Sequence, residues 1–140
     1  MAFDRHGLEI LEPEQCLALL ASTPIARIGL SIDALPVVLP VNIVVDDTQI
    51  VMRGAHDTKL GRAMHGTVVA VEADDYDVMT HTGWSVLVRG TSRMVQDHDE
   101  LERLRRLAVT AWIDDDADTW ICVAAELISG RRIRRDRVRS

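Results

Sequence analysis

Short segments rich in β-branched and aliphatic residues, separated by brief turns, constrain the fold of this chain more than any other feature. Six such segments are expected to form strands, at residues 25–32, 37–45, 49–53, 67–73, 84–95 and 119–128. Consecutive strands joined by short turns favour antiparallel pairing, because parallel pairs need long crossover connections. The order predicts a mainly β (α+β) fold, in which a six-stranded antiparallel sheet closes into a small Greek-key barrel.

Three short helices are expected between the strands. The first covers residues 13–21, since Pro13 suits a first helical turn and an apolar stripe follows it. The second covers 57–65, with Asp57 as N-cap and Gly66 as the stop. The third covers 97–108, where Asp97 and Glu100 have capping-box spacing.

Finer features of the strands are also readable. The apolar run 37–45 is expected to be buried on both faces, and the acidic run 74–82 to form a polar loop. Gly90 marks a bulge or bend in a long strand.

Composition limits the class of protein. The chain has 140 residues, of which 47% are hydrophobic, and a net charge of −6. Its last ten residues carry six arginines, so the rest is more acidic than the total suggests, which argues against nucleic acid as the main ligand. We expect one domain over residues 1–133, on which Arg131 and Arg132 dock, and an Arg-rich tail over 134–140 that frays.

Location and metal binding follow from residue types. No stretch is long and apolar enough to span a membrane, and no secretory leader is recognisable. The two cysteines cannot form a disulfide framework, and the five histidines are scattered without metal-ligand spacing. We therefore expect a reduced, cytoplasmic protein without a metal site.

An anion site is predicted where one strand gives way to the second helix. Arg53 ends a strand, Gly54 and Ala55 follow, and Thr58 and Lys59 begin the helix. Free amide groups at a helix start, a hydroxyl and two cations are the groups that bind phosphate. A capped helix with a solvated lysine explains the same spacing equally well.

Two further features are candidate ligand contacts. Pro40 removes a ladder donor and belongs on an edge strand, where backbone groups of Leu39, Val41 and Asn42 could bond a planar heterocycle. Trp84 and Ser85 open a strand, and Trp84 suits either a flat ligand or the core.

Together these motifs resemble the flavin-binding split β-barrel family called pyridoxamine 5′-phosphate oxidase-like, closest to its short actinobacterial branch related to nitroimidazole-resistance proteins. The resemblance rests on Pro-Val-Asn at 40–42, Thr-Lys-Leu at 58–60, the run from Gly83 to Gly90, and Gly-Arg-Arg-Ile at 130–133.

The resemblance implies a homodimer that binds FMN at its interface. It implies cofactor contacts from the residues Leu39, Pro40, Val41, Asn42, Met52, Arg53, Thr58, Lys59, Leu60, Trp84 and Ser85. It also suggests Trp112 or Trp120 as a contact to the partner's flavin. The alternative cofactor in the same groove is a deazaflavin.

Departures from the family pattern bear on activity. Met52-Arg53 stands where the vitamin B6 oxidases have an aromatic-Thr pair, Thr58 replaces an arginine, and their C-terminal Arg/His substrate set has no clear match. Oxidation of vitamin B6 is therefore disfavoured. The expected chemistry is hydride transfer from reduced nicotinamide through flavin to a small acceptor, with catalytic residues unassigned. Two alternatives are a deazaflavin-dependent reductase and a non-catalytic flavin- or haem-binding protein.

Overall fold

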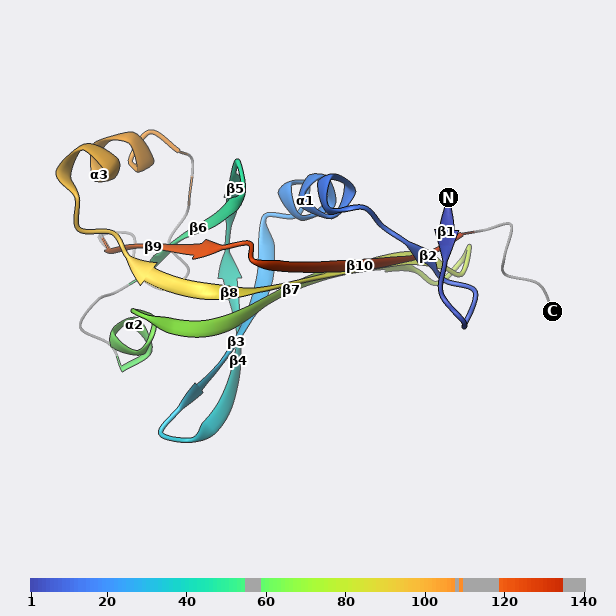
Figure 1. Cartoon of the computed structure of the whole chain (residues 1–140), viewed down its shortest axis with the longest axis horizontal. Helices are drawn as coiled ribbons and strands as arrows, with labels where there is room; N and C mark the ends of the chain where they lie inside the picture. Colours follow the sequence, from blue (N-terminus) through green and yellow to red (C-terminus); the bar gives the residue numbers. More distant parts are fainter. Residues whose placement is uncertain (55–58, 108, 110–118, 135–140) are drawn as a thin grey trace.

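The computed structural model describes residues 1–54, 59–107, 109 and 119–134, and shows three helices among antiparallel strands (Figure 1). The helices are α1 (Pro13–Ala21), α2 (Lys59–Ala63) and α3 (His98–Leu104). The strands are β1 (Ala2–Phe3), β2 (Glu9–Ile10), β3 (Ile25–Ile32), β4 (Leu35–Asn42), β5 (Val44–Asp46), β6 (Gln49–Gly54), β7 (Thr67–Asp77), β8 (Thr82–Met94), β9 (Thr119–Ala124) and β10 (Leu127–Ile133). The mainly β class and its three helices are confirmed.

All strand pairs of the described residues are antiparallel. One path runs β1-β2-β10-β8-β7-β3-β4, and β5, β6 and β9 branch from it through β8. Strand β8 has two successive partners on one side, since residues Gly83–Arg89 pair with β10 and Ser92–Met94 with β9. This change of partner turns part of the sheet into the barrel and leaves the rest as an arm that reaches towards both termini (Figure 1).

The described residues form ten strands rather than the six expected. The run 37–45 is divided between β4 and β5, because Ile43 turns inward and its N–H donates to the carbonyl of Pro24 at 3.0 Å. The run 119–128 is divided between β9 and β10 at Ala125 and Glu126. Strands β1 and β2 have two residues each and leave no periodic pattern in the sequence.

Two expectations about strand environment are wrong. The run 37–45 is not buried on both faces, since Val38 of β4 is 67% exposed. The acidic run is not wholly a loop, because β7 continues to Asp77, which pairs with Thr82. Strand β7 is polar there because it has left the barrel for the arm, where both faces meet water (Figure 1).

The core divides into two apolar clusters. The larger fills the barrel with inward residues of β3, β7 and β8, including Ile28, Val71 and Val88, and α1 adds Leu20. The smaller lies between α3, β6 and β9, where Leu104, Val51 and Trp120 meet.

Gly90 allows a close backbone approach. The β7–β8 register runs through it without a bulge, Val69 standing opposite Gly90. A Cβ at this position would lie 1.7 Å from the carbonyl oxygen of Ala124, where β9 ends. Only glycine therefore lets the chain turn from β9 to β10 across the middle of β8.

The helix termini follow the sequence signals in part. Helix α2 ends at Ala63 rather than at 65, and Gly66, with a φ of +71°, donates its N–H to the Ser92 carbonyl at 2.8 Å instead of capping the helix. The Asp97 side chain accepts from the Glu100 N–H at 2.9 Å and caps α3, which ends at Leu104 rather than 108. The Glu100 carboxylate accepts two bonds from Arg93, at 2.7 and 2.8 Å, instead of completing a capping box.

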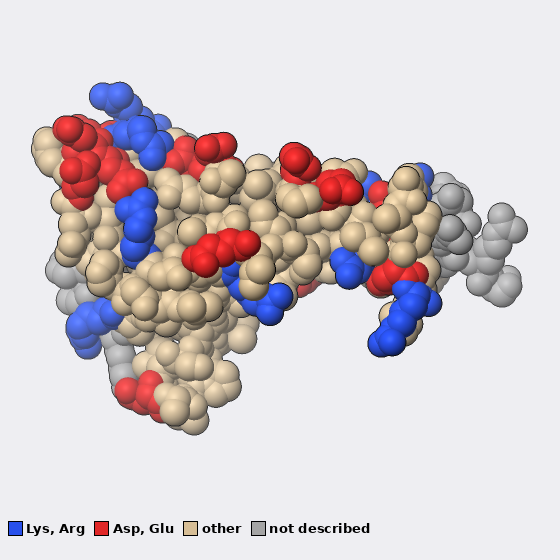
Figure 2. All heavy atoms as spheres, in the orientation of Figure 1, with Lys and Arg blue, Asp and Glu red and all other residues tan. Residues whose placement is uncertain are grey.

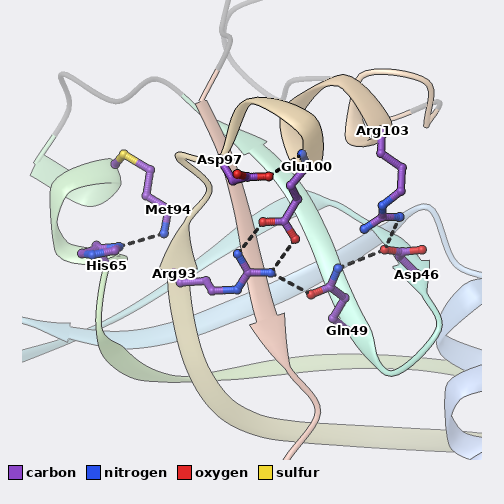
Figure 3. Close-up of polar contacts among 8 residues, drawn as sticks. All are labelled: Asp46, Gln49, His65, Arg93, Met94, Asp97, Glu100 and Arg103. Carbon is purple, nitrogen blue, oxygen red and sulfur yellow. Dashed lines mark hydrogen bonds and ion pairs between the residues drawn. The ribbon is translucent and has the colours of Figure 1, made fainter.

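A polar network holds α3 against the barrel (Figure 3). Arg93 of β8 binds Glu100 and also donates to the Gln49 side-chain oxygen at 3.3 Å. Gln49 in turn donates to Asp46 at 2.9 Å, which accepts from Arg103 at 2.9 Å. Two helical residues are thereby tied to the β5–β6 hairpin and to β8.

The first arginines of the C-terminal segment dock on the body as expected. Arg131 donates to Asp4 at 3.1 Å, and Arg132 lies 3.7 Å from the Glu9 carboxylate. The expectation that the chain frays from Arg134 onwards is wrong at Arg134 itself, which donates to Glu9 at 3.3 Å. Residues 135–140 lie outside the described residues.

Candidate functional site

The outer edge of β4 is open in the described part of the chain, where β4 pairs only with β3. Pro36 and Pro40 stand opposite Ser31 and Arg27. A proline has no N–H to give to a ladder, so the pairs that contain it are the non-hydrogen-bonded ones. The prediction that Pro40 belongs on an edge strand is confirmed.

The position of the two prolines fixes which backbone groups face this edge. Every second residue of β4, counted from these prolines, directs its N–H and C=O groups away from β3. At the open edge, Val38 and Asn42 therefore present N–H donors, while Pro36 and Pro40 present carbonyls. Leu39 and Val41 are out of phase: their amides face β3 and their side chains pack against the barrel core. Of the three expected donors only Asn42 faces the edge, and Val38 joins it.

The predicted anion site is described only at its first residues. Met52 is 2% exposed and packs in the barrel core. The Arg53 guanidinium lies 5.3 Å from the centroid of the Trp120 ring and donates to the Val109 carbonyl at 3.2 Å. Thr58 and the side chains of Lys59 and Leu60 lie outside the described residues, so their contact with phosphate stays a prediction.

The tryptophans do not all lie where the resemblance suggested. Trp120 is 3% exposed and sits in the smaller core cluster, so the expectation that it reaches a partner's flavin is wrong. Trp112 lies outside the described residues. Trp84 is half-buried and packs against the barrel core, in agreement with the core alternative.

Trp84 and Ser85 point to opposite faces of β8, because successive strand residues alternate. Ser85 is exposed on the outer face, between Asp74 of β7 and Arg131 of β10 in the register. Between Ser85 and the open edge of β4 lie β7 and β3, so three strand spacings, about 14 Å, separate them. One copy of the chain cannot bring both groups to the same end of a planar ring.

Sequence reasoning missed a charged cluster on this outer face. Arg27 Nη1 donates to Glu72 at 3.1 Å and to Asp74 at 3.3 Å, across β3 and β7. Burial, together with the neighbouring Asp74 carboxylate, raises the pKa of Glu72, and Arg27 opposes this. These groups border an open hollow of about 340 Å³ whose floor is Gly29 and Ala70. The sequence signal that could have indicated this cluster was the alternation along 68–74, in which every second residue points outward from β7.

Charges of both signs are interspersed on the face that Figure 2 shows, with acidic and basic side chains adjacent at the α3 end. Among the described residues no helix is long and apolar enough to cross a membrane. In the same part of the chain no three His, Cys, Asp or Glu side chains are grouped to hold a metal ion.

Comparison with known proteins identifies the family. The family described as pyridoxamine 5′-phosphate oxidase matches residues 12–132. An uncharacterized protein of Mycobacterium tuberculosis is 35% identical over 131 residues, which span 90% of this chain and 86% of that protein. The chain belongs to the pyridoxamine 5′-phosphate oxidase family and has its split-barrel fold.

Solved structures agree with this assignment. The chain is similar to an FAD-binding protein from Mycobacterium smegmatis, with 36% identity, a TM-score of 0.77, and coverage of 89% of this chain and 98% of that one. A protein from Corynebacterium glutamicum described as a pyridoxamine 5′-phosphate oxidase is 27% identical, with a TM-score of 0.79 and coverage of 90% and 92%. A nitroimidazole-resistance protein from Bacteroides thetaiotaomicron, 13% identical at a TM-score of 0.70 with coverage of 89% and 87%, shares the fold alone.

Proposed function

We propose that this protein is a flavin-binding oxidoreductase that works as a homodimer. The open edge of β4 is the observation that carries the proposal, because two prolines keep it unpaired while Val38 and Asn42 present N–H donors there. Alternating donors and carbonyls suit the polar edge of a flavin ring, which itself carries both carbonyls and an N–H.

The comparisons support a flavin. The relative from Mycobacterium smegmatis, which this chain matches at 36% identity over nearly the whole of that protein, binds FAD. FAD contains FMN as one of its parts. We propose that the β4 edge at Val38, Pro40 and Asn42 holds the flavin ring, while Arg53, Thr58 and Lys59 hold the FMN phosphate. An FAD would extend its adenylate beyond these residues.

A bound flavin would supply hydride transfer, here from a reduced nicotinamide to a small acceptor. The chain's own contribution is placement. The β4 edge would fix the ring in its plane, and the buried side chain of Met52 anchors β6 in the barrel core one residue before Arg53. Positioning of this kind needs no acid–base residue in the chain.

The outer sheet face supports the homodimer. Ile25, Val38, Val68 and Leu127 are between 46% and 68% exposed, and the register places them on the same face of the sheet. Exposed apolar side chains gathered on one face are typical of a contact surface, and here they share that face with the Arg27–Glu72–Asp74 cluster. A second copy would also resolve the separation between the β4 edge and Ser85, because one ring could then meet the edge of one protomer and Ser85 of the other.

The released cofactor tests the proposal. The purified protein is expected to show flavin absorption, and mass spectrometry of the released ligand separates FMN, FAD and a deazaflavin. Anaerobic bleaching by reduced nicotinamide would support an oxidoreductase. A flavin that no reductant bleaches, or a Soret band from haem, would favour the non-catalytic alternative and contradict the proposal.

A further inference from the structure

The Arg27–Glu72–Asp74 cluster lies between the two groups that the proposed homodimer brings to one flavin ring. Arg27 of β3 stands opposite Pro40 of the β4 edge on one side and opposite Glu72 of β7 on the other. Asp74, two residues after Glu72 and on the same face of β7, stands opposite Ser85 of β8. The cluster therefore occupies the strands that separate the β4 edge from Ser85.

Symmetry fixes the place of the twofold axis relative to this cluster. A closed homodimer is related by a twofold axis, which exchanges the two copies and with them the two rings. One ring would lie at the β4 edge of a protomer and the other at Ser85 of the same protomer, so the axis passes midway between these positions, over β3 and β7. Residues at the axis meet their own counterparts, and the clusters of the two copies therefore face each other.

The surface at this place is open to a second copy. The cluster borders the hollow of about 340 Å³ whose floor is Gly29 and Ala70, where the sheet carries no side chain larger than a methyl group. Within the chain, Arg27 binds both carboxylates through Nη1. Its Nε and Nη2 groups have no acceptor in the part of the chain that the structure describes, and its side chain is 55% exposed.

We propose that two copies of this chain contact each other through the cluster, with each Arg27 donating its remaining N–H groups to the carboxyl groups of Glu72 and Asp74 in the other copy. Hydrogen bonds between arginine and carboxylate are directional, so this pairing sets the register of two sheet faces that apolar contacts alone would leave free to slide. The inference rests on the proposed homodimer and adds the residues that align it.

The charge balance gives this contact a pH dependence. Two copies bring two arginines and four carboxyl groups to the axis, because Glu72 is flanked by Arg27, Asp74 and the apolar Leu87. Protonation of Glu72, whose pKa is already raised by burial and by Asp74, removes the excess negative charge. The dimer then binds more protons than two monomers, so its dissociation constant should fall as the pH falls.

Charge-reversed variants of the full-length protein, with the cofactor that copurifies, test whether the clusters meet. Arg27→Glu creates a cluster of three acidic groups, and Glu72→Lys combined with Asp74→Lys creates a cluster of three cations. Each variant alone should raise the dissociation constant of the homodimer by roughly tenfold or more, because like charges meet at the axis. An equimolar mixture of the two should form heterodimer in native mass spectrometry, and less of it at high salt.

Asp75→Lys combined with Glu102→Lys is the matched control for the basic variant. It makes the same change of net charge, on the opposite face of β7 and in an exposed bridge of α3, and should leave the homodimer unchanged. Homodimers that persist in both reversed variants, or a mixture without heterodimer, would overturn the inference.

Glu72→Gln provides a second readout that needs no reversal of charge. In sedimentation experiments the dissociation constant of the unmodified protein should be roughly threefold or more higher at pH 8 than at pH 5, whereas that of Glu72→Gln should change by less than about twofold. An equal pH dependence of the two proteins would overturn the inference.

The state of the unmodified protein separates this inference from the proposed function. A dimer that forms the mixed species but takes up no flavin would sustain the contact and refute the flavin proposal. A flavin-bound dimer whose variants form no mixed species would refute the contact alone, and a flavin-bound monomer would refute the contact and the homodimer together.

Discussion

Individual residues show how much the sequence discloses about the site. Pro40 indicates an edge strand from the sequence alone, because a proline lacks an N–H wherever it lies in the fold. The Arg27–Glu72–Asp74 cluster is not disclosed, because its members are 45 and 47 residues apart and meet only through the pairing of β3 with β7. In the same way, the choice of Val38 over Leu39 as an edge donor depends on a register that the sequence does not state.

Lys59 is predicted to be the main phosphate cation, and Lys59→Ala tests it. Loss of a charge-assisted hydrogen bond should weaken flavin binding by roughly 1.5–3 kcal/mol, measured by fluorescence titration. Arg62→Ala removes the same charge from the last turn of α2 and should change the affinity little. Equal effects of the two substitutions would remove Lys59 from the site.

Gly90 should tolerate no side chain. Gly90→Ala places a methyl group on the Ala124 carbonyl and is expected to cost about 3 kcal/mol or more of unfolding free energy in urea denaturation. Gly29→Ala is the matched control, because its Cβ would meet Ala70 Cβ at an ordinary 3.8 Å, and it should cost less than about 1 kcal/mol. Similar costs at both positions would contradict the assigned close approach.

At the scale of elements, the sequence predicts where most strands and helices lie but not how they divide. Strand β3 and helix α1 have the expected bounds, because alternation and an apolar stripe with a proline start are local signals. The break between β9 and β10 carries no glycine or proline: Ala125 and Glu126 bend because Gly90 on β8 leaves space for them. That cause lies on another strand, so no local pattern reports it.

The network around α3 gives a pH dependence of known sign. The two N–H groups of Arg93 lower the pKa of Glu100, and the bond from Gln49, with Arg103, lowers that of Asp46. A carboxyl group whose pKa is lower in the folded than in the unfolded state contributes its full stabilisation when the pH is above the unfolded-state pKa. That stabilisation is lost as the pH falls through the folded-state pKa. Stability should therefore decline below about pH 4.

Glu100→Gln isolates this contribution. It should cost about 1 kcal/mol of unfolding free energy at pH 7 and much less at pH 3, measured by chemical denaturation at both values. Glu102→Gln removes the same charge from the same helix, where the bridge to Arg105 is exposed, and should cost at most about 0.5 kcal/mol. A cost of Glu100→Gln that does not change with pH would contradict the role of its charge.

At the scale of the whole molecule, the fold class followed from strand order and short turns, whereas the open outer face did not. Alternation showed which positions leave the core, but Val38, Val68 and Leu127 look like core residues in a sequence. Their exposure appears only when the sheet is closed and the barrel interior is already full.

Val68→Asp tests the proposed homodimer. A charge in the apolar contact should shift the protein towards monomer in sedimentation experiments and weaken flavin binding with it, since each site would draw on both copies. Met79→Asp adds the same charge to a residue that is 85% exposed at the tip of the β7–β8 turn, and should leave both properties unchanged. Undiminished dimer and flavin binding in Val68→Asp would show that this face is not the contact.

Calorimetric titration of cofactor-free, folded protein with FMN, FAD and a deazaflavin cofactor tests the central claim most directly. We predict saturable binding of at least one of the three at one site per chain, with the phosphate-free riboflavin bound more weakly. Heats indistinguishable from dilution for all three, in a sample whose circular dichroism shows the folded sheet, would contradict it.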